Sequence, residues 1–419
     1  GKAKGLLRLK PIENELNEYF TSARAYVPHF LVVPTDVSLI SQYNKIVAAA
    51  RSLGSEKFAV RSSSTLEDVG DNSFDGIFST ERDITLDQLV RSISRVRKSA
   101  TSPKARAYAE EVGVELTGSM PVIVQADVQN ADFTGVVYSR FPSPYSIVKI
   151  VRDCLQGERK GERLIEAFER ESGRKFDYIG SKPIIFTKDG SRNLELKFEA
   201  ERLAEVALKI EQVFGYPVIL EFAYFIEDAK EKYRMDGKWI KISYNPEGRD
   251  MQVISLLQAR RLTNIDEATR FQAPELQEKG LVAMTYDVNG VGDVSGKAFV
   301  VRIGEESRLM TRGLRKFDRD MQGQGYILVT NHIEFWGQEI DSMTPNKKGI
   351  LAYSSLGQHH DMEIARKRGI IYLNCNHSLL SAFRRVGERE HRRKEPIKTG
   401  DQIRLVSDGV KGFVYNLSR

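Results

Sequence analysis

Two adjacent histidines, His359 and His360, are the clearest candidates for chemistry in this sequence. They are two of six histidines among 419 residues, and they precede an expected helix in SSLGQHHDMEIARKRGIIYL, residues 354–373. A neutral imidazole is a competent nucleophile or metal ligand near its ordinary pKa of about 6.5. A helix that begins just after His360 would direct N–H groups toward a phosphate bound there. Three roles stay open at this point: a reactive group, a metal ligand and a polar helix start.

A metal site is the alternative raised by His359 and Glu363, because they have the i, i+4 spacing of one helix face. His360 and His377 would complete such a site. No cysteine cluster and no HExxH motif accompanies them. The sequence therefore gives a metal centre at this position little support.

The first half of the chain carries residues suited to binding phosphate. In AVRSSSTLEDVGDNSFDGIFST, residues 59–80, a strand delivers Arg61 into a loop of hydroxyl groups, acids and glycines. A guanidinium binds phosphate through two hydrogen bonds, and serine hydroxyls add further donors. The opening GKAKGL supplies a flexible glycine and Lys2 as a point charge. From spacing alone, a surface turn with an incidental arginine explains the loop at least as well.

Two expected strands carry polar residues that suit Mg²⁺ and phosphate. Glu221 interrupts the apolar LEFAYF, and Gln258 and Arg260 share one face of the strand in LLQARRLT. A carboxylate and an amide oxygen can hold Mg²⁺, and Arg260 can neutralise phosphate charge. Pairing of Glu221 with a structural arginine is the simpler alternative.

Composition narrows the classes of protein. The hydrophobic fraction is 41% and the charged fraction is 29%, as in ordinary globular proteins. The net charge of +6, from 63 basic and 57 acidic residues, suits anionic ligands but is too small to indicate nucleic acid. No apolar run spans a membrane and no signal peptide opens the chain, while two cysteines fit a reducing cytosol. We therefore expect a cytoplasmic protein with no membrane or nucleic-acid partner.

The elements that position these residues form two groups. Up to residue 263, strands are expected at 28–34, 57–63, 120–128, 133–139, 218–226 and 252–260, and helices at 36–53 and 196–213. This mixture predicts a domain of α/β or α+β class. Residues 264–284 are expected to be a polar linker. Short strands with one or two helices then predict a second domain over 285–419.

Six segments occur in the order found in one family: GKAKGL, PHFLVVPT, FAVRSSSTLEDVGDNSFDGIFST, VIVQADVQNADFTGVVYSRFP, FGYPVILEFAYF and LLQARRLT. They resemble the ATP-grasp nucleotide-binding domain of phosphoenolpyruvate synthase, pyruvate phosphate dikinase and rifampin phosphotransferase. The second half is similar to the small β/β/α swivelling phosphohistidine domain of those enzymes. The resemblance thus implies an ATP-grasp-like domain over 1–263 and a phosphohistidine domain over 285–419.

The resemblance also implies roles for individual residues. Lys2, Arg61 and Arg260 match phosphate-binding positions, and Glu221 and Gln258 match the metal and nucleotide ligands. Adenine would lie along the segment 124–128, with Gln125 and Val128 as nucleotide contacts. His360 matches the phosphorylated histidine, because Arg366 lies six positions after it as in the family. The residues so implied are Lys2, Arg61, Gln125, Val128, Glu221, Gln258, Arg260 and His360.

The implied activity is ATP-dependent phosphoryl transfer with Mg²⁺, through phosphorylated His360, in the manner of a dikinase that leaves AMP. A simple kinase that leaves ADP stays open. The sequence departs from the family at Asp361, whose carboxylate would repel a phosphoryl group, and within 150–190, where the glycine-rich pattern is lost. A catalytically inactive, nucleotide-responsive regulatory or binding module is therefore the alternative.

The largest departure from the family concerns the phosphoryl acceptor. Only about 20 residues separate the two expected domains. They leave no room for the pyruvate-binding barrel of dikinases or the drug-binding insertion of rifampin phosphotransferase. We therefore expect the acceptor to be on another polypeptide, on a missing segment, or to be a small molecule.

Overall fold

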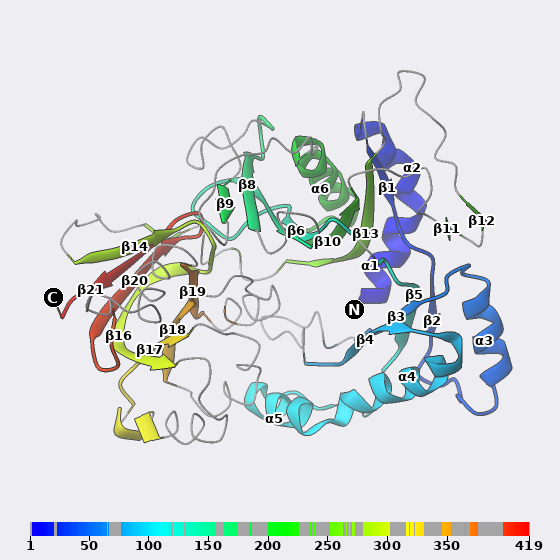
Figure 1. The fold of residues 1–419 in the computed structure, drawn as a ribbon, viewed down its shortest axis with the longest axis horizontal. Helices are drawn as coiled ribbons and strands as arrows, with labels where there is room; N and C mark the ends of the chain where they lie inside the picture. The colour runs from blue at the N-terminus through cyan, green and yellow to red at the C-terminus, as the bar shows by residue number, and fades with distance from the viewer. Residues whose placement is uncertain are drawn as a thin grey trace, which may run out of the picture. The chain divides into compact units, whose positions relative to one another are not determined.

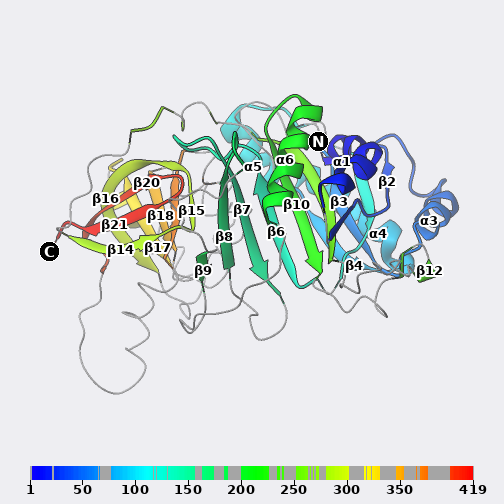
Figure 2. The same ribbon diagram turned by 90° about the horizontal axis from the view of Figure 1, so that it is seen from above.

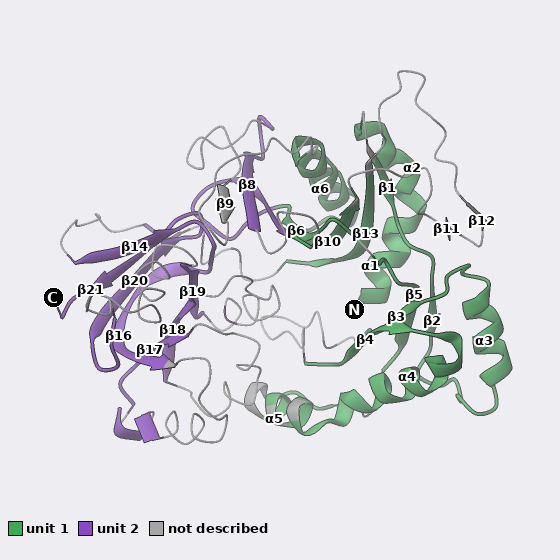
Figure 3. Ribbon diagram, viewed as in Figure 1, with its two compact units in different colours: residues 1–139, 154–160, 196–262 green, residues 140–153, 161–195, 263–419 purple. Residues whose placement is uncertain are grey.

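The computed structural model describes two compact units, and each is treated by itself (Figure 3). Unit 1 consists of residues 1–139, 154–160 and 196–262, and unit 2 of residues 140–153, 161–195 and 263–419. The described residues are 2–20, 23–64, 66, 77–116, 118, 120–129, 131–155, 163–173, 184–186, 200–225, 234–235, 238–239, 252–262, 265, 268, 270–272, 280–301, 316–317, 319–321, 323–330, 346–352, 365, 369–375 and 397–418.

Unit 1 contains an antiparallel four-stranded sheet covered by helices (Figure 1). The helix α4 packs against β3 and β4 and buries its apolar residues with those of the sheet. Helix α5 begins where Ser102 Oγ accepts the N–H of Ala105, and it ends at Gly113 with a φ of 67°. In sheet order the strands are β2 (Phe30–Val33), β5 (Val122–Ala126), β3 (Phe58–Ser62) and β4 (Thr80–Ile84), and the helices are α3 (Tyr43–Arg51), α4 (Leu86–Lys98) and α5 (Pro103–Val112).

A second group of strands in unit 1 pairs in the order β1, β13, β10, β6. β1 runs parallel to β13, and the other pairs are antiparallel. Helix α6 packs on β10 and β6, and α1 packs on β13 (Figure 2). The elements are α1 (Lys2–Leu9), α2 (Glu13–Leu16), β1 (Ala23–Tyr26), β6 (Phe133–Tyr138), α6 (Ala200–Phe214), β10 (Val218–Phe225) and β13 (Gln252–Arg261), with a small ladder of β11 (Arg234–Met235) and β12 (Lys238–Trp239).

Unit 2 contains an eight-stranded sheet in the order β14-β21-β20-β16-β17-β18-β19-β15. β16 to β19 are mutually parallel, and the outer pairs are antiparallel. Only Tyr286 and Asp287 separate β14 from β15, which stand at opposite ends of this order, so the sheet must curl strongly. The strands are β14 (Leu281–Thr285), β15 (Val288–Asn289), β16 (Val291–Val301), β17 (Tyr326–Thr330), β18 (Lys347–Ala352), β19 (Ile371–Asn374), β20 (Gln402–Asp408) and β21 (Gly412–Asn416).

A ladder of β7 (Ile147–Cys154), β8 (Arg163–Glu169) and β9 (Ile184–Phe186) also belongs largely to unit 2. Buried ionic contacts join it to the curled sheet. Arg163 donates to both oxygens of Asp153, at 2.6 and 2.8 Å, and to Asp287 Oδ2 at 2.9 Å. Lys149 Nζ donates to the carbonyl oxygens of Val288 (3.0 Å) and Gly409 (3.3 Å). The curled sheet is therefore fixed to β7 and β8 by charged groups that water does not reach.

The mixed α/β class expected from the sequence is confirmed, and most expected strands are present. The expected helix at 36–53 is shorter, because α3 starts only at Tyr43 and turns precede it. The strands expected at 120–128 and 133–139 belong to different sheets, so residues 127–132 connect β5 to β6 across unit 1. Residues 140–153 and 161–195, which fall within the expected first domain, belong to unit 2 together with the second half of the chain. β14 overlaps the end of the expected linker at 264–284.

Candidate functional site

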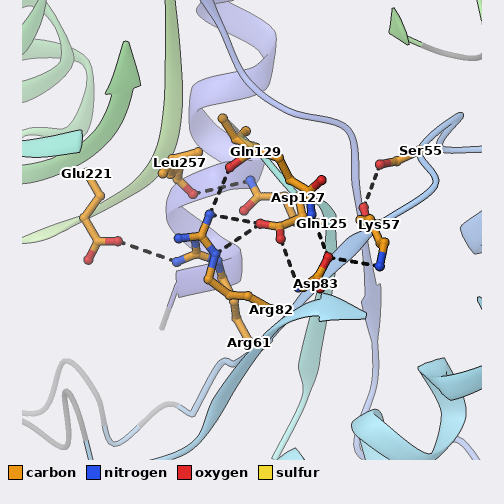
Figure 4. Close-up of polar contacts among 11 residues, drawn as sticks. Ser55, Lys57, Arg61, Arg82, Asp83, Gln125, Asp127, Gln129, Glu221 and Leu257 are labelled. Atoms are coloured by element: carbon orange, nitrogen blue, oxygen red, sulfur yellow. Dashed lines mark hydrogen bonds and ion pairs between the residues drawn. The ribbon is translucent and has the colours of Figure 1, made fainter. Parts of the chain in front are cut away.

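Glu221 of β10 lies between two of the arginines expected to bind phosphate. Its Oε2 is 3.5 Å from Arg61 Nη1 on β3, and its Oε1 is 3.6 Å from Arg260 Nη2 on β13 (Figure 4 shows the contact with Arg61). The exposed fraction of the three side chains is 18%, 10% and 8% respectively. Glu221 is thus paired with arginines, as the simpler alternative held. Those arginines are the two that were expected to bind phosphate, so the pairing and the expected phosphate site involve the same residues.

Among the residues that the structure describes, the cluster around Glu221 holds more cations than carboxylates. Lys2 is buried and its Nζ lies 3.4 Å from Ser62 Oγ, next to Arg61 in β3. Counting these described residues alone, Lys2, Arg61 and Arg260 carry three positive charges and Glu221 carries one negative charge, a formal sum of 3 − 1 = +2. Burial lowers the pKa of the Arg61 guanidinium, and Glu221 opposes that effect. A buried excess of cations favours a multiply charged anion such as a polyphosphate.

Helix α1 places Lys2 by packing unusually close to β13. A Cβ atom on Gly5 would lie 1.8 Å from the carbonyl oxygen of Ala259. The N–H of Ala3 donates to Ser63 Oγ at 2.9 Å and fixes the first turn. Gly5 of GKAKGL lies inside this helix, and its lack of a side chain permits the close approach to β13.

Gln258 has the features of a ligand-binding side chain. It is 1% exposed, and within the described residues neither atom of its amide group makes a hydrogen bond. A buried amide without partners is costly, so a bound group is the natural source of its hydrogen bonds or coordination. Gln258 pairs directly with Glu221 in the ladder of β10 and β13, which puts both side chains on one face of the sheet.

A cation that prefers oxygen fits this pair of donors. Glu221 supplies a carboxylate and Gln258 an amide oxygen, which is the donor chemistry of a Mg²⁺ site completed by phosphate and water. Among the described residues, no group of three His, Cys, Asp or Glu side chains forms a metal site. A cation held by Glu221 and Gln258 could take further ligands from phosphate and water.

The expected adenine segment lies next to this cluster. Gln125 is 1% exposed, and its Nε2 lies 3.4 Å from the carbonyl oxygen of Leu257, the neighbour of Gln258 (Figure 4). The carbonyl oxygen of Val128 accepts a hydrogen bond from Arg82 Nη2 at 3.0 Å. Both residues are thus held by protein contacts at one wall of the site. Their contact with a nucleotide stays a prediction.

Sequence patterns missed Arg82 and Asp127, which hold this wall in place. Arg82 Nε and Nη2 lie 3.1 and 3.0 Å from Asp127 Oδ1. The sequence feature that could have identified Asp127 is its position directly after the buried strand β5. Serines 62 and 63, expected as phosphate donors, contact Lys2 and the Ala3 N–H in the structure.

The expected phosphohistidine loop lies outside the described residues. His359, His360, Asp361, Glu363 and Arg366 all fall there, as do His377 and the loop at 67–76. Their roles stay predictions. In the part of the chain that the structure describes, no helix is long and apolar enough to cross a membrane.

Comparison with known proteins agrees with the resemblance. The family model described as "Pyruvate phosphate dikinase, AMP/ATP-binding domain" matches residues 29–280. That segment contains Arg61, Gln125, Glu221, Gln258 and Arg260. The match confirms the expected family and its ATP-grasp-like nucleotide-binding domain.

Curated relatives are more distant and longer. The chain is 25% identical over 251 residues to "Uncharacterized phosphotransferase YvkC" of Bacillus subtilis, which covers 55% of this chain and 26% of that protein. It is 22% identical over 390 residues to a "Probable phosphoenolpyruvate synthase" of Pyrococcus horikoshii, which covers 85% of this chain and 40% of that protein. The chain thus spans about a quarter to two fifths of the length of these relatives.

A solved structure of ATP citrate lyase from Methanothrix soehngenii is 10% identical and covers 91% of this chain and 98% of that one, with a TM-score of 0.29. A score of that size carries no argument about fold or function. The family assignment rests on the family model, which matches more than half of the chain. Of the seven expected residues in the cluster and its wall, the matched segment includes all except Lys2. The chain belongs to the pyruvate phosphate dikinase AMP/ATP-binding domain family.

Proposed function

We propose that this chain is an ATP-dependent phosphotransferase of the dikinase kind, which passes a phosphoryl group from ATP through His360 to an acceptor. The observation that carries the proposal is Glu221 between Arg61 and Arg260, with the amide of Gln258 buried beside it and making no hydrogen bond within the described residues. The names of the curated relatives, a phosphotransferase and a phosphoenolpyruvate synthase, support the reaction class.

The described residues would act by holding phosphate and neutralising its charge. Phosphoryl transfer needs little covalent help from the protein beyond in-line positioning and stabilisation of charge on the phosphate oxygens. Arg61 and Arg260 present guanidinium groups from two sheets, and Lys2 adds an ammonium group from α1. Glu221 and Gln258 would hold Mg²⁺, which when bound supplies further neutralisation of the phosphates.

The covalent step falls to His360. An imidazole nitrogen would attack phosphorus with its lone pair, and the bond from phosphorus to the leaving oxygen would break with its electrons going to that oxygen. Attack at the β-phosphorus leaves AMP and a pyrophosphoryl-histidine, which loses phosphate to water before the remaining phosphoryl group passes to the acceptor. Attack at the γ-phosphorus leaves ADP.

Labelled ATP tests this proposal. The protein is incubated with ATP carrying label at the β or the γ position, and acid-labile, base-stable label on the protein is measured. We expect β-label to be retained and AMP to form, and we expect His360→Ala to abolish both while His359→Ala keeps them. A wild type that binds ATP but never carries label would instead be a nucleotide-responsive module without transferase activity. Loss of label in His359→Ala alone would move the role to that histidine.

A further inference from the structure

The carboxylate of Asp127 is an anchor built into unit 1. Its side chain is 4% exposed and accepts hydrogen bonds from Arg82 Nε (3.1 Å), Arg82 Nη2 (3.0 Å) and the N–H of Asp83 (3.0 Å). Burial of a carboxylate is costly unless charged donors compensate it. The bonds to Arg82 are charge-assisted and belong to the stronger class of hydrogen bonds. Asp127 is therefore tied firmly to β4.

The same contacts continue along the next two residues. Arg82 Nη2 also donates to the carbonyl oxygen of Val128 at 3.0 Å, and Gln129 Nε2 donates to Asp83 Oδ1 at 2.8 Å (Figure 4). Asp83 in turn pairs with Lys57 Nζ at 3.1 Å. Each residue of 127–129 is thus bound to a side chain or backbone group of β4, and we call this arrangement the β4 clamp.

The backbone of β4 is shaped to make these contacts. Asp83 has a φ of 60°, and among the described residues it is the only non-glycine residue with a positive φ. That conformation is unfavourable for most side chains and persists where surrounding contacts hold it. Here it accompanies the bond from the Asp83 N–H to Asp127. The clamp therefore includes a strained residue held by several partners.

The clamp borders the cationic cluster. Burial is the main effect on the pKa of Arg61, followed by Glu221, Arg82 and Asp127, so the clamp lies within electrostatic reach of that guanidinium. Two residues before Asp127, the side chain of Gln125 contacts the carbonyl oxygen of Leu257, which precedes Gln258. A ligand whose phosphates lie on Arg61 and Arg260 has residues 127–129 as an adjoining wall (Figure 4).

We propose that Arg82 and Asp127 are positioning residues that fix 127–129 as the wall against which the nucleobase is read, and so set the preference for ATP over GTP. The inference rests on the proposed nucleotide binding. Hydrogen bonds to a base lose strength within a few tenths of an ångström and about 30° of misalignment, so the groups that read it need a fixed backbone. In this proposal neither residue is a phosphate ligand, so loss of the clamp should weaken reading of the base far more than binding of the phosphates.

Binding of three ligands to a small set of variants tests the clamp. Dissociation constants for ATP, GTP and inorganic tripolyphosphate are measured for the wild type, Arg82→Ala and Arg82→Lys. In Arg82→Ala we expect ATP affinity to fall about tenfold, the loss of one or two hydrogen bonds to the base. The ATP/GTP ratio should approach one, and the affinity for tripolyphosphate should change by less than about twofold. Arg82→Lys should be intermediate, because one ammonium group cannot reproduce the planar fork.

Arg95→Ala is the matched control. Arg95 makes a closer pair with Glu81 of β4, at 2.7 and 2.6 Å, but has no hydrogen bond to 127–129. It should keep the wild-type ATP/GTP ratio. If Arg82→Ala fails to fold, Asp127→Asn provides the same test, because it keeps the shape and removes the charge.

Two results would overturn the inference and are distinguishable. An Arg82→Ala or Asp127→Asn protein that keeps the wild-type ATP/GTP ratio contradicts the clamp while leaving the proposed function intact. A variant whose affinities for ATP and tripolyphosphate fall together also contradicts the clamp, because such a loss indicates that Arg82 or Asp127 has a structural or phosphate-binding role. A wild type that binds neither ATP nor tripolyphosphate overturns the proposed function itself, and the clamp with it.

Discussion

Glu221 and Arg260 stand on the paired strands β10 and β13, with Glu221 Oε1 3.6 Å from Arg260 Nη2. The pair is more open than a tight ion pair, and Arg61 approaches the other carboxylate oxygen at 3.5 Å. A carboxylate held loosely between two guanidinium groups keeps both within reach of an anion and also presents oxygen to a cation. This geometry is what the proposed site for Mg²⁺ and polyphosphate rests on.

Glu221→Gln tests that dual role. Removing the charge raises the formal sum over Lys2, Arg61, Arg260 and residue 221 from +2 to +3, so ATP without Mg²⁺ should bind more tightly, by a few-fold. The gain in affinity that Mg²⁺ gives the wild type should largely disappear. Calorimetric titration with and without Mg²⁺ measures both effects. Glu81→Gln, which neutralises an acid of β4 paired with Arg95, is the control. An undiminished Mg²⁺ effect in Glu221→Gln would contradict the metal role.

Gly5→Ala tests how α1 positions Lys2. The new Cβ would lie 1.8 Å from the backbone oxygen of Ala259, so α1 must move away from β13. We expect a loss of about 1–3 kcal/mol in the free energy of unfolding, as for other overpacked cores, together with weaker tripolyphosphate binding. Gly325→Ala is the control, because the three atoms nearest to its Cβ belong to the exposed side chain of Lys348 and not to backbone. Unchanged stability in Gly5→Ala would show that α1 is not packed as described.

Arg163→Met tests the ionic network of unit 2. The guanidinium is 1% exposed and pairs with Asp153 and Asp287, so its loss leaves two buried carboxylates without that cation. We expect the free energy of unfolding to fall by about 3–5 kcal/mol, measured by denaturant titration. Arg404→Met removes a comparable pair with Asp293, at 2.7 and 2.5 Å, whose side chains are 26% and 30% exposed. This control should lose no more than about 1 kcal/mol. Equal losses would contradict the difference in burial.

Lys149 predicts a pH dependence of stability. Burial lowers the pKa of Lys149 from 10.5 to about 8. Between those values the unfolded chain binds the proton and the folded chain does not, so the free energy of unfolding rises with pH across this window. The rise should be about 3 kcal/mol, at 1.36 kcal/mol per pKa unit.

The difference between wild type and Lys149→Met isolates this effect from other titrating groups. In denaturant titrations from pH 7 to 11, the free energy of unfolding of the wild type minus that of Lys149→Met should increase with pH. Lys348→Met, at an exposed lysine of β18, is the control and should give a difference that does not change with pH. A flat difference for Lys149→Met would contradict burial of the charged group.

One part of the cationic cluster was predictable from strand geometry, namely that Gln258 and Arg260 share a face, whereas the position of Glu221 opposite Gln258 depends on how two strands pair. Gln258 and Arg260 are two positions apart on one strand, and Glu221 sits in an apolar strand that pairs with it. Period-two patterns place such side chains on a common face without any knowledge of the full fold. The clustering of Arg61 with Glu221 additionally required the resemblance, since β3 belongs to another sheet.

The clamp, the close packing of Gly5 and the ionic network could not be predicted in that way. Arg82 and Asp127 are 45 positions apart, and Arg163 and Asp287 are 124 apart. Their pairing depends on which sheets meet, and a single sequence does not encode that in local spacing. Likewise, the need for glycine at position 5 becomes apparent only when β13 is known to pack against α1.

The most direct test of the central claim is the affinity for Mg²⁺-ATP of wild type and Arg260→Met, compared by calorimetry. Arg260→Met keeps much of the side-chain volume and removes one of the two guanidinium groups on Glu221. We predict measurable ATP binding by the wild type and a loss of at least about tenfold in the variant, as expected for a charge-assisted bond to phosphate. Equal affinities of the two proteins for ATP, or no binding by the wild type, would contradict a nucleotide-phosphate site at Arg61, Glu221 and Arg260.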